Sequence, residues 1–282
     1  MIKLIMNMRG GFVLRNKISL IIMVVSTALL FFSVYKIIEW KMDNNATEKL
    51  ITNINDVVEI EELEDENVVL SEISQNRDIV KKDYYWKFVE LPLMKVNFAN
   101  LNDINSDTVA FINVPSTNIN YPIVQTYNND YYLNHTYDRS NNGAGWVFLD
   151  YRNNLNELSS NSVIYAHGRV DNTMFGTLKN TLTKEWLDNP DNYYIRLITP
   201  GYSSIWQVFS VYRVKTESYY LQTTFSRENE KLEFYNKLLN RSTHDFNTSI
   251  DVEDKLLTLS SCYNQFEKVV IHAKLIKQGY YK

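Results

Sequence analysis

An uncharged, strongly apolar stretch at residues 18–35 (ISLIIMVVSTALLFFSVY) constrains this chain more than any other feature of its 282 residues. A membrane-spanning helix needs roughly 18 or more apolar residues in succession, and a helix of a soluble domain is rarely apolar on every side. The sequence therefore predicts a single transmembrane anchor over residues 18–38. A buried helix of a globular domain is the alternative interpretation.

The charges on either side of this stretch predict its orientation. Residues 1–17 carry four basic side chains and no acidic one, whereas residues 36–43 carry both signs. Because basic flanks stay in the cytoplasm, we expect residues 1–17 to be a cytoplasmic tail and the rest of the chain to be extracytoplasmic. A cleaved signal peptide is the alternative, but the following KIIEWKMDNN offers no A-x-A-like cleavage site.

An acidic segment, EIEELEDEN at residues 59–67, follows the predicted anchor. Dense like charge is typical of a solvated surface, so we interpret residues 39–83 as an extracytoplasmic helical stalk. Low-affinity calcium binding by the acidic cluster is an alternative. From about residue 84 the composition becomes that of a folded domain, which we expect to span residues 84–282.

Short runs of β-branched and aromatic residues, bounded by Asn, Asp, Ser and Gly, recur along residues 84–282 and favour a β-rich barrel or sandwich. The predicted strands are residues 109–114, 162–166, 206–214, 255–261 and 268–276. In the third of them, alternation predicts one face made of Trp206, Val208, Ser210, Tyr212 and Val214.

One segment has the spacing of an amphipathic helix instead of a strand. Residues 226–240 place apolar side chains three or four positions apart, at Leu232, Tyr235, Leu238 and Leu239. Ser226 is the predicted N-cap of this helix.

The chain has one cysteine, Cys262, so an internal disulfide and a cysteine-rich zinc site are both excluded. The net charge of the whole chain is −4, and it is still more negative for the part after the four basic residues of 1–17. This charge argues against a nucleic-acid-binding protein. Cys262 ends the strand run TLSSC, where a side chain can face a cleft. A buried structural thiol and a nucleophile both remain open interpretations.

A nucleophilic cysteine needs an imidazole partner and a cation near the developing oxyanion. Of the four histidines, His167 is the best placed, because it ends the run SVIYAH. His272 lies inside a strand run and is expected in the core, whereas His135 and His244 lie in polar surroundings typical of surface residues. Lys268 is the nearest cation after Cys262, and an exposed lysine at a strand start is its alternative interpretation.

These motifs resemble those of the class B sortases of Gram-positive bacteria. The resemblance is carried by TLSSC, VVIHAKL, VIYAHG and MFGTL, and also by residues 112–138 and GWVFLDYRN. It covers about residues 97–276. It implies a mainly β fold, the sortase-type eight-stranded β-barrel, with N-terminal helices and one late amphipathic helix, preceded by a single transmembrane helix. Residues 84–282 would then be the sortase catalytic domain.

The resemblance also implies a cysteine transpeptidase that anchors surface proteins to the cell wall. Cys262 would attack the Thr carbonyl of a C-terminal sorting motif in a secreted protein and form a thioacyl enzyme. An amine of peptidoglycan or lipid II would resolve it, with His167 acting as general acid and then as base. No metal and no organic cofactor is required. The implied partners are these proteins, the amine and the membrane, without nucleic acid.

Further site residues are carried over from the family pattern by position. The implied substrate-binding residues are Asn129, Leu133, Thr216, Tyr220, Leu221 and Ser260. For Leu133, Tyr220 and Leu221, ordinary core packing is the alternative. Where the family has an arginine four residues before H-A-K, this chain has Lys268, which keeps the charge but not the forked donor geometry. Arg169 or Arg213 are alternative cations.

Two other functions stay open at this point. A binding or scaffold protein that kept the barrel but lost the reaction is suggested by Lys268. An L,D-transpeptidase shares the Cys/His chemistry, but the chain has Ser261 before Cys262 and no S-H-G-C motif. We favour an active enzyme because Cys262 and His167 are both present.

Overall fold

The computed structural model describes residues 2–71 and 84–282, which fall into two compact units, one ending at Ala46 and one spanning Thr47–Lys282. Helix α1 (Ile2–Val57) makes up the first unit as far as Ala46, and its last residues, from Thr47, belong to the second unit. Within the described residues, this is the one helix long and apolar enough, by length and composition, to cross a membrane, from Ile18 onwards. The boundaries predicted for the cytoplasmic tail (residues 1–17) and the membrane anchor (residues 18–38) remain predictions.

The second unit is mainly β. Its strands are β1 (Ile60–Leu63), β2 (Val68–Leu70), β3 (Leu93–Val96), β4 (Thr108–Asn113), β5 (Asn120–Val124), β6 (Phe148–Leu149), β7 (Asn161–Tyr165), β8 (Tyr194–Ile198), β9 (Tyr202–Lys215), β10 (Leu256–Cys262) and β11 (Glu267–Tyr281). Its α-helices are α2 (Tyr85–Val89), α3 (Phe98–Ile104), α4 (Lys184–Leu187) and α5 (Glu228–Asn240). The 3₁₀ helices are η1 (Asp65–Asn67), η3 (Tyr131–Leu133), η4 (Leu178–Leu182), η5 (Pro190–Asn192) and η6 (Tyr219–Leu221).

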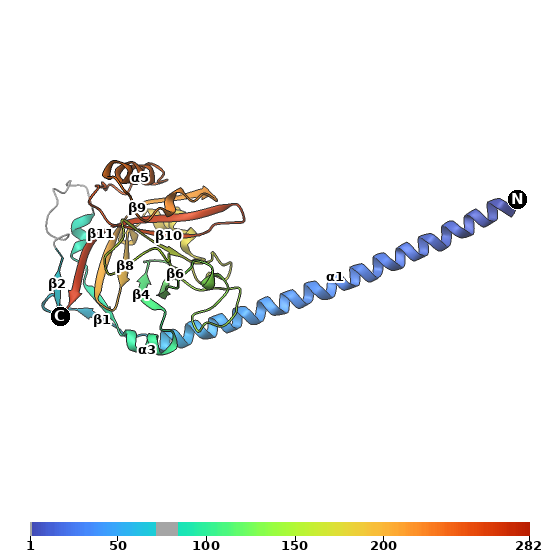
Figure 1. Ribbon diagram of the computed structural model, residues 1–282, viewed down its shortest axis with the longest axis horizontal. Helices are drawn as coiled ribbons and strands as arrows, with labels where there is room; N and C mark the ends of the chain where they lie inside the picture. Colours follow the sequence, from blue (N-terminus) through green and yellow to red (C-terminus); the bar gives the residue numbers. More distant parts are fainter. Residues whose placement is uncertain (1, 72–83) are drawn as a thin grey trace. The chain divides into compact units, whose positions relative to one another are not determined.

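Eight of these strands close into a barrel, in the order β10-β7-β6-β5-β4-β8-β9-β11, because β11 also pairs with β10 (Figure 1). Closure gives each of the eight strands a partner on both sides, and β2 pairs with the end of β11 (residues 279–281), beyond the part that pairs with β10. The predicted fold class is confirmed. The main core cluster contains fully buried side chains of β4, β9, β10 and β11, among them Phe111, Trp206, Leu257 and Ile271.

Strand β9 departs from the predicted alternation. Trp206, Val208 and Val211 belong to the barrel core, whereas Phe209, Tyr212 and Val214 pack in a second cluster with α5, which Figure 1 shows over this wall. Ser210 pairs with His272 and Val208 pairs with Ala273, so Phe209 is an extra residue opposite β11. A bulge of this kind shifts every following side chain to the other face. The predicted single face is therefore wrong after Val208.

Helix α5 confirms the predicted amphipathic helix but corrects its start and its buried face. It begins at Glu228 with Arg227 as N-cap, so Ser226 is not the cap. The buried residues are Phe234, Tyr235 and Leu238, while Leu232 is 38 % exposed. The reason is aromatic packing, because the Phe234 ring lies 4.9 Å from that of Phe225 in the preceding loop.

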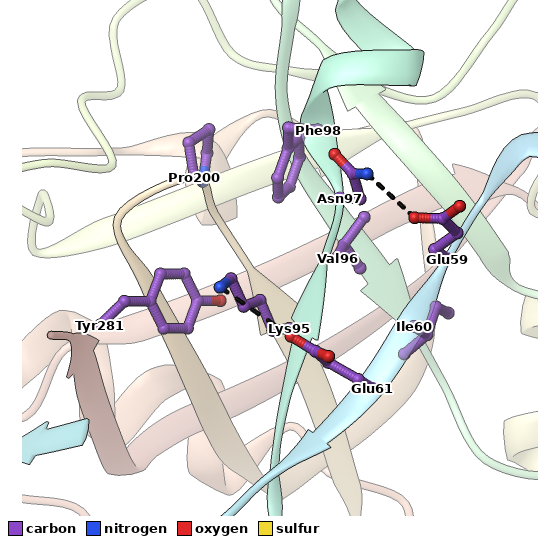
Figure 2. Close-up of a pocket in the computed structure, with 9 residues that line it drawn as sticks. All are labelled: Glu59, Ile60, Glu61, Lys95, Val96, Asn97, Phe98, Pro200 and Tyr281. Carbon is purple, nitrogen blue, oxygen red and sulfur yellow. Dashed lines mark hydrogen bonds and ion pairs between the residues drawn. The ribbon is translucent and has the colours of Figure 1, made fainter. Parts of the chain in front are cut away.

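The acidic segment is not the predicted helix. β1 pairs antiparallel with β3, and β2 pairs with the last residues of β11. Figure 2 shows the side chains at this end of the barrel, where Asn97 donates to Glu59 (2.9 Å) and Lys95 lies 3.9 Å from Glu61. Pairing with distant strands overrides the local charge pattern. Residues 72–83 of the predicted stalk lie outside the described residues.

His272 is a fully buried core residue, as its place in a strand run predicted. Its Nε2 lies 2.8 Å from the Tyr212 hydroxyl and its Nδ1 lies 2.8 Å from Thr258 Oγ1. Thr258 donates its hydroxyl hydrogen to Asn161 Oδ1 (2.7 Å), so its oxygen accepts from the His272 Nδ1–H, and His272 Nε2 accepts from the Tyr212 hydroxyl. Both nitrogens of the neutral imidazole are therefore satisfied. Burial lowers the pKa of His272 to about 3.

This burial predicts a loss of stability in mild acid. Below the ordinary histidine pKa of 6.5 the unfolded chain binds a proton that the folded chain does not, down to about pH 3. His272 alone should therefore lower the free energy of unfolding by about 1.4 kcal/mol per pH unit in this window. Urea unfolding at pH 7, 6 and 5 measures this slope, which His272→Gln should reduce. Equal slopes in the two proteins would contradict the prediction.

Candidate active site

Strand register brings Cys262 and His167 to the same end of the barrel. β10 runs parallel to β7, with Ser260 opposite Tyr165. Cys262 and His167 each lie two residues further along. The chain segments touch there, because a Cβ built on Gly168 would lie 2.0 Å from the Cys262 carbonyl oxygen. Only glycine allows this approach, so Gly168 is part of what places the two side chains together.

Lys268 approaches the same sulfur from the other neighbouring strand. Cys262 and Lys268 are directly opposite each other in the antiparallel β10–β11 pair, so their side chains share one face. Lys268 Nζ donates a hydrogen bond to Cys262 Sγ at 3.0 Å, and both residues are half-buried. The ammonium is therefore placed beside the sulfur and beside any group bound to it.

His167 has one ring nitrogen occupied and one left for chemistry. Its Nε2 lies 2.8 Å from the carbonyl oxygen of Leu133, in η3. A carbonyl oxygen can only accept, so Nε2 carries the hydrogen and Nδ1 has the free lone pair. Gly145, with φ +60°, makes room for this contact, since a Cβ there would lie 3.0 Å from both Leu133 O and His167 Cδ2.

One open pocket of about 650 Å³ collects the predicted site residues. Its lining includes Cys262, His167 and Lys268 together with all the predicted substrate-binding residues, Asn129, Leu133, Thr216, Tyr220, Leu221 and Ser260. Its other lining residues are Phe148, Tyr165, Ala166, Glu217, Ser218 and Ser261, which the sequence interpretation missed. Ser261 donates to the Ala166 carbonyl (2.9 Å) and so joins the ends of β10 and β7.

The alternative cations do not reach this pocket. Arg169 donates to Asp171 (2.7 Å) and Thr173 (2.9 Å). Arg213 lies 3.2 Å from Glu267. Among the pocket-lining residues that the structure describes, Lys268 is the one lysine or arginine.

Tyr220 combines the pocket and core roles that its sequence position left open. It is 1 % exposed and packs in the cluster beneath α5, and it also lines the pocket, where its hydroxyl lies 3.0 Å from Ser260 Oγ. Thr216 is exposed, and its N–H donates to the Phe266 carbonyl (3.1 Å) in the β10–β11 hairpin. These contacts hold the segment after β9 over the barrel end.

His135 and His244 lie outside the pocket lining. The His135 ring stacks on Tyr131 with centroids 4.0 Å apart. His244 Nε2 lies 2.9 Å from the Tyr193 hydroxyl. Both are half-buried, so each packs more closely than the predicted surface position requires.

Sequence interpretation also missed Asp150, a fully buried carboxylate directly after β6. Burial acts to raise the pKa of Asp150, but hydrogen bonds from Arg152 and Tyr165 outweigh it and hold that pKa below its ordinary value. The signal available in the sequence was an aspartate placed directly after the apolar run WVFL.

A thiol beside an ammonium, an imidazole with a free Nδ1 and a half-open pocket form the site of a cysteine acyltransferase on a closed β-barrel. Comparison with known proteins places it in a family. Residues 112–276 match the sortase domain. The sortase B of Listeria monocytogenes is 33 % identical over 181 residues, covering 63 % of this chain and 73 % of that protein. The chain belongs to the sortase family, as a class B sortase.

Two further relatives agree in sequence and in structure. The sortase B of Staphylococcus aureus is 31 % identical over 193 residues, covering 65 % of this chain and 76 % of that protein. The solved structure of sortase B from B. anthracis in complex with AAEK1 is 31 % identical with a TM-score of 0.65, covering 84 % of this chain and 99 % of that one. The family establishes a cysteine transpeptidase.

Proposed function

We propose that this sortase cleaves a C-terminal sorting motif after threonine and joins the secreted protein to a peptidoglycan or lipid II amine. The observation that carries the proposal is the meeting of Cys262, His167 and Lys268 in one pocket, with Lys268 Nζ 3.0 Å from the sulfur. Each of the three comes from a different strand end, so the barrel itself fixes their arrangement.

The chemistry follows from the three side chains. The Cys262 thiol gives its proton to the free Nδ1 of His167 as the sulfur attacks the threonine carbonyl carbon, and the resulting oxyanion lies within the field of the Lys268 ammonium. His167 passes this proton to the leaving amine as the C–N bond breaks, which leaves a thioacyl enzyme. The incoming amine attacks this thioester and loses a proton to His167, and the departing Cys262 sulfur takes that proton back. The free Nδ1 of His167 is the atom that carries the proton.

Solved relatives support the two substrates. One structure is an S. aureus sortase B–substrate complex, 32 % identical with a TM-score of 0.58. Another is a sortase B complexed with triglycine, 29 % identical with a TM-score of 0.60. Triglycine presents a free amino group, which is the chemical group that resolves a thioester. For this chain, Asn129, Leu133, Thr216, Tyr220, Leu221 and Ser260 would contact the sorting motif.

The same proposal covers the location of the enzyme. Residues 1–17 would be a cytoplasmic tail, residues 18–38 the single-pass anchor, residues 39–83 a connecting region, and residues 84–282 the extracytoplasmic catalytic domain. The apolar side chains from Ile18 to Val34, exposed in the structure, support insertion in lipid. The four basic residues before them support the orientation.

The direct test is turnover of a fluorogenic sorting-peptide library by the full chain in detergent, with triglycine as the amine. We expect cleavage after threonine and a product extended by triglycine, detected by mass. The proposal fails if no peptide of the library is cleaved or acylates the enzyme.

Lys268 should account for a large part of the rate. Lys268→Gln removes the ammonium from the sulfur and from the oxyanion, so kcat/KM should fall about 10²- to 10³-fold. Lys268→Arg keeps the charge and should stay within about tenfold of the parent. The assay is the peptide cleavage described above.

Lys215→Gln is the matched control for Lys268→Gln. Lys215 is exposed on the neighbouring strand, where it pairs in register with Glu267, and it does not line the pocket. Its loss should leave the rate unchanged. Unaltered activity in Lys268→Gln would disprove the assigned role, and a large gain in Lys268→Arg would show that lysine impairs the enzyme.

A further inference from the structure

Asp150 is a carboxylate bonded by two pocket-lining residues, Asn129 and Tyr165, although it does not line the pocket itself. It is 0 % exposed. Arg152 donates to it three times, from its backbone N–H (3.0 Å), Nε (2.8 Å) and Nη2 (2.7 Å). The Tyr165 hydroxyl donates at 2.8 Å and Asn129 Nδ2 at 3.0 Å. These five bonds use both carboxylate oxygens.

The partners of Asp150 come from three separate walls of the pocket. Asn129 lies in the loop before η3, and Tyr165 ends β7. Arg152 extends the network to a third wall, because its Nη2 also donates to the carbonyl of Leu221 in η6 (3.0 Å). Asn129, Tyr165 and Leu221 all line the pocket. One buried charge therefore ties together segments that are far apart in the chain.

The hydrogen bonds to Asp150 also determine which donors and acceptors Asn129 and Tyr165 offer to a substrate in the pocket. The Asn129 amide is held at both ends, since its Oδ1 accepts from the Tyr151 N–H (3.0 Å) while its Nδ2 donates to Asp150. Tyr165 uses its hydrogen on Asp150, so its oxygen is left as an acceptor. The amide of Asn129 keeps one hydrogen to donate.

We propose that Asp150 is the positioning residue of the substrate pocket, holding Asn129, Tyr165 and the Leu221 segment in the arrangement that binds the acyl substrate. This inference rests on the proposed function of the pocket. Asp150 acts through its partners and not on the reacting atoms, so its loss should weaken substrate binding more than it slows the chemical steps.

The experiment compares Asp150→Asn with the parent as full chains in detergent. The asparagine has the same shape but lacks the charge that accepts five donors. We expect KM for the sorting peptide to rise about tenfold or more while kcat changes less than about threefold. The rate of Cys262 alkylation by iodoacetamide should stay unchanged, because this small reagent does not need the pocket walls. Hydrogen exchange should rise at residues 128–133 and 219–223.

Asp138→Asn is the matched control. The Asp138 carboxylate is bonded by Thr136 (2.7 Å) and Ser140 (3.1 Å) within its own loop and does not line the pocket. Its loss should leave KM and the exchange of both segments unchanged. Arg152→Lys is the second variant. It keeps the charge but loses the fork in which Nε, bonded to Asp150, orients Nη2 toward the Leu221 carbonyl, so it should raise exchange at residues 219–223 alone.

The outcomes separate this inference from the proposed function. If Asp150→Asn has the same KM and the same hydrogen exchange as the parent, Asp150 does not have the proposed role. A parallel loss of alkylation rate and of barrel protection would also overturn it, by showing a general structural role. If Asp150→Asn does not fold, Arg152→Lys decides by the exchange of residues 219–223. If the parent turns over no peptide, the proposed function fails, while the exchange measurements still test Asp150.

Discussion

Cys262→Ala should reduce sorting-peptide turnover by at least about 10⁴-fold, because no other group of the pocket can form the thioacyl intermediate. The side chain is half-buried at a strand end, so its truncation leaves no large cavity and the melting temperature should stay close to that of the parent. The measurement is peptide cleavage together with intact mass, in which the parent but not the variant accumulates an acyl adduct.

His135→Ala serves as the control for this prediction, because His135 lies outside the pocket lining and its loss should leave the acyl adduct and turnover unchanged. His167→Ala should instead lower turnover about 10²- to 10⁴-fold, as expected for a general acid–base. Cys262→Ala that is as active as the parent would refute the nucleophile assignment.

Gly168→Ala should have the second large effect, on stability and activity together. Its Cβ would lie 2.0 Å from the Cys262 carbonyl oxygen and 3.0 Å from Ser261 Oγ, so the ends of β7 and β10 must separate. Such overpacking costs about 1–3 kcal/mol or more. Since His167 and Cys262 lie at these two ends, we also expect kcat/KM to fall by about 10²-fold.

Thermal unfolding and peptide cleavage measure the two effects of Gly168→Ala. Gly143→Ala is the matched control, because nothing lies within 4 Å of its built Cβ and Gly143 is not among the described glycines with positive φ. It should keep the stability and rate of the parent. Indistinguishable behaviour of the two alanine variants would show that the close approach at Gly168 is not required.

Residue type and alternation along the sequence predicted most of the strands, but not which strands pair with each other. The runs ending at Cys262 and at His167 are apparent as strands from β-branched content. That β7 and β10 are parallel neighbours is a property of the closed barrel, which the residues of the two strands do not contain. The meeting of Lys268 with Cys262 was better founded, because a short hairpin brings adjacent strands together.

The wrong predictions have the same physical origin. The bulge at Phe209 exists in the pairing of β9 with β11, so the residues of β9 alone do not reveal it. The acidic residues of β1 have a composition typical of a solvated helix, but backbone pairing with the distant strand β3 makes them a strand. Asp150 joins segments around Asn129, Tyr165 and Leu221, and no local window of sequence contains them all.

The two strands that complete the active site are also the last two of the chain. β11 pairs with β9 and β10 and receives β2 from the other end of the sequence. During synthesis, the barrel therefore stays open until the final strand is available, and such long-range pairing is slow. Cys262 gains its ammonium partner only when Lys268 pairs across from it. The two side chains therefore come together only after β10 and β11 have paired, so the acyl-transfer site forms no earlier than the closed barrel.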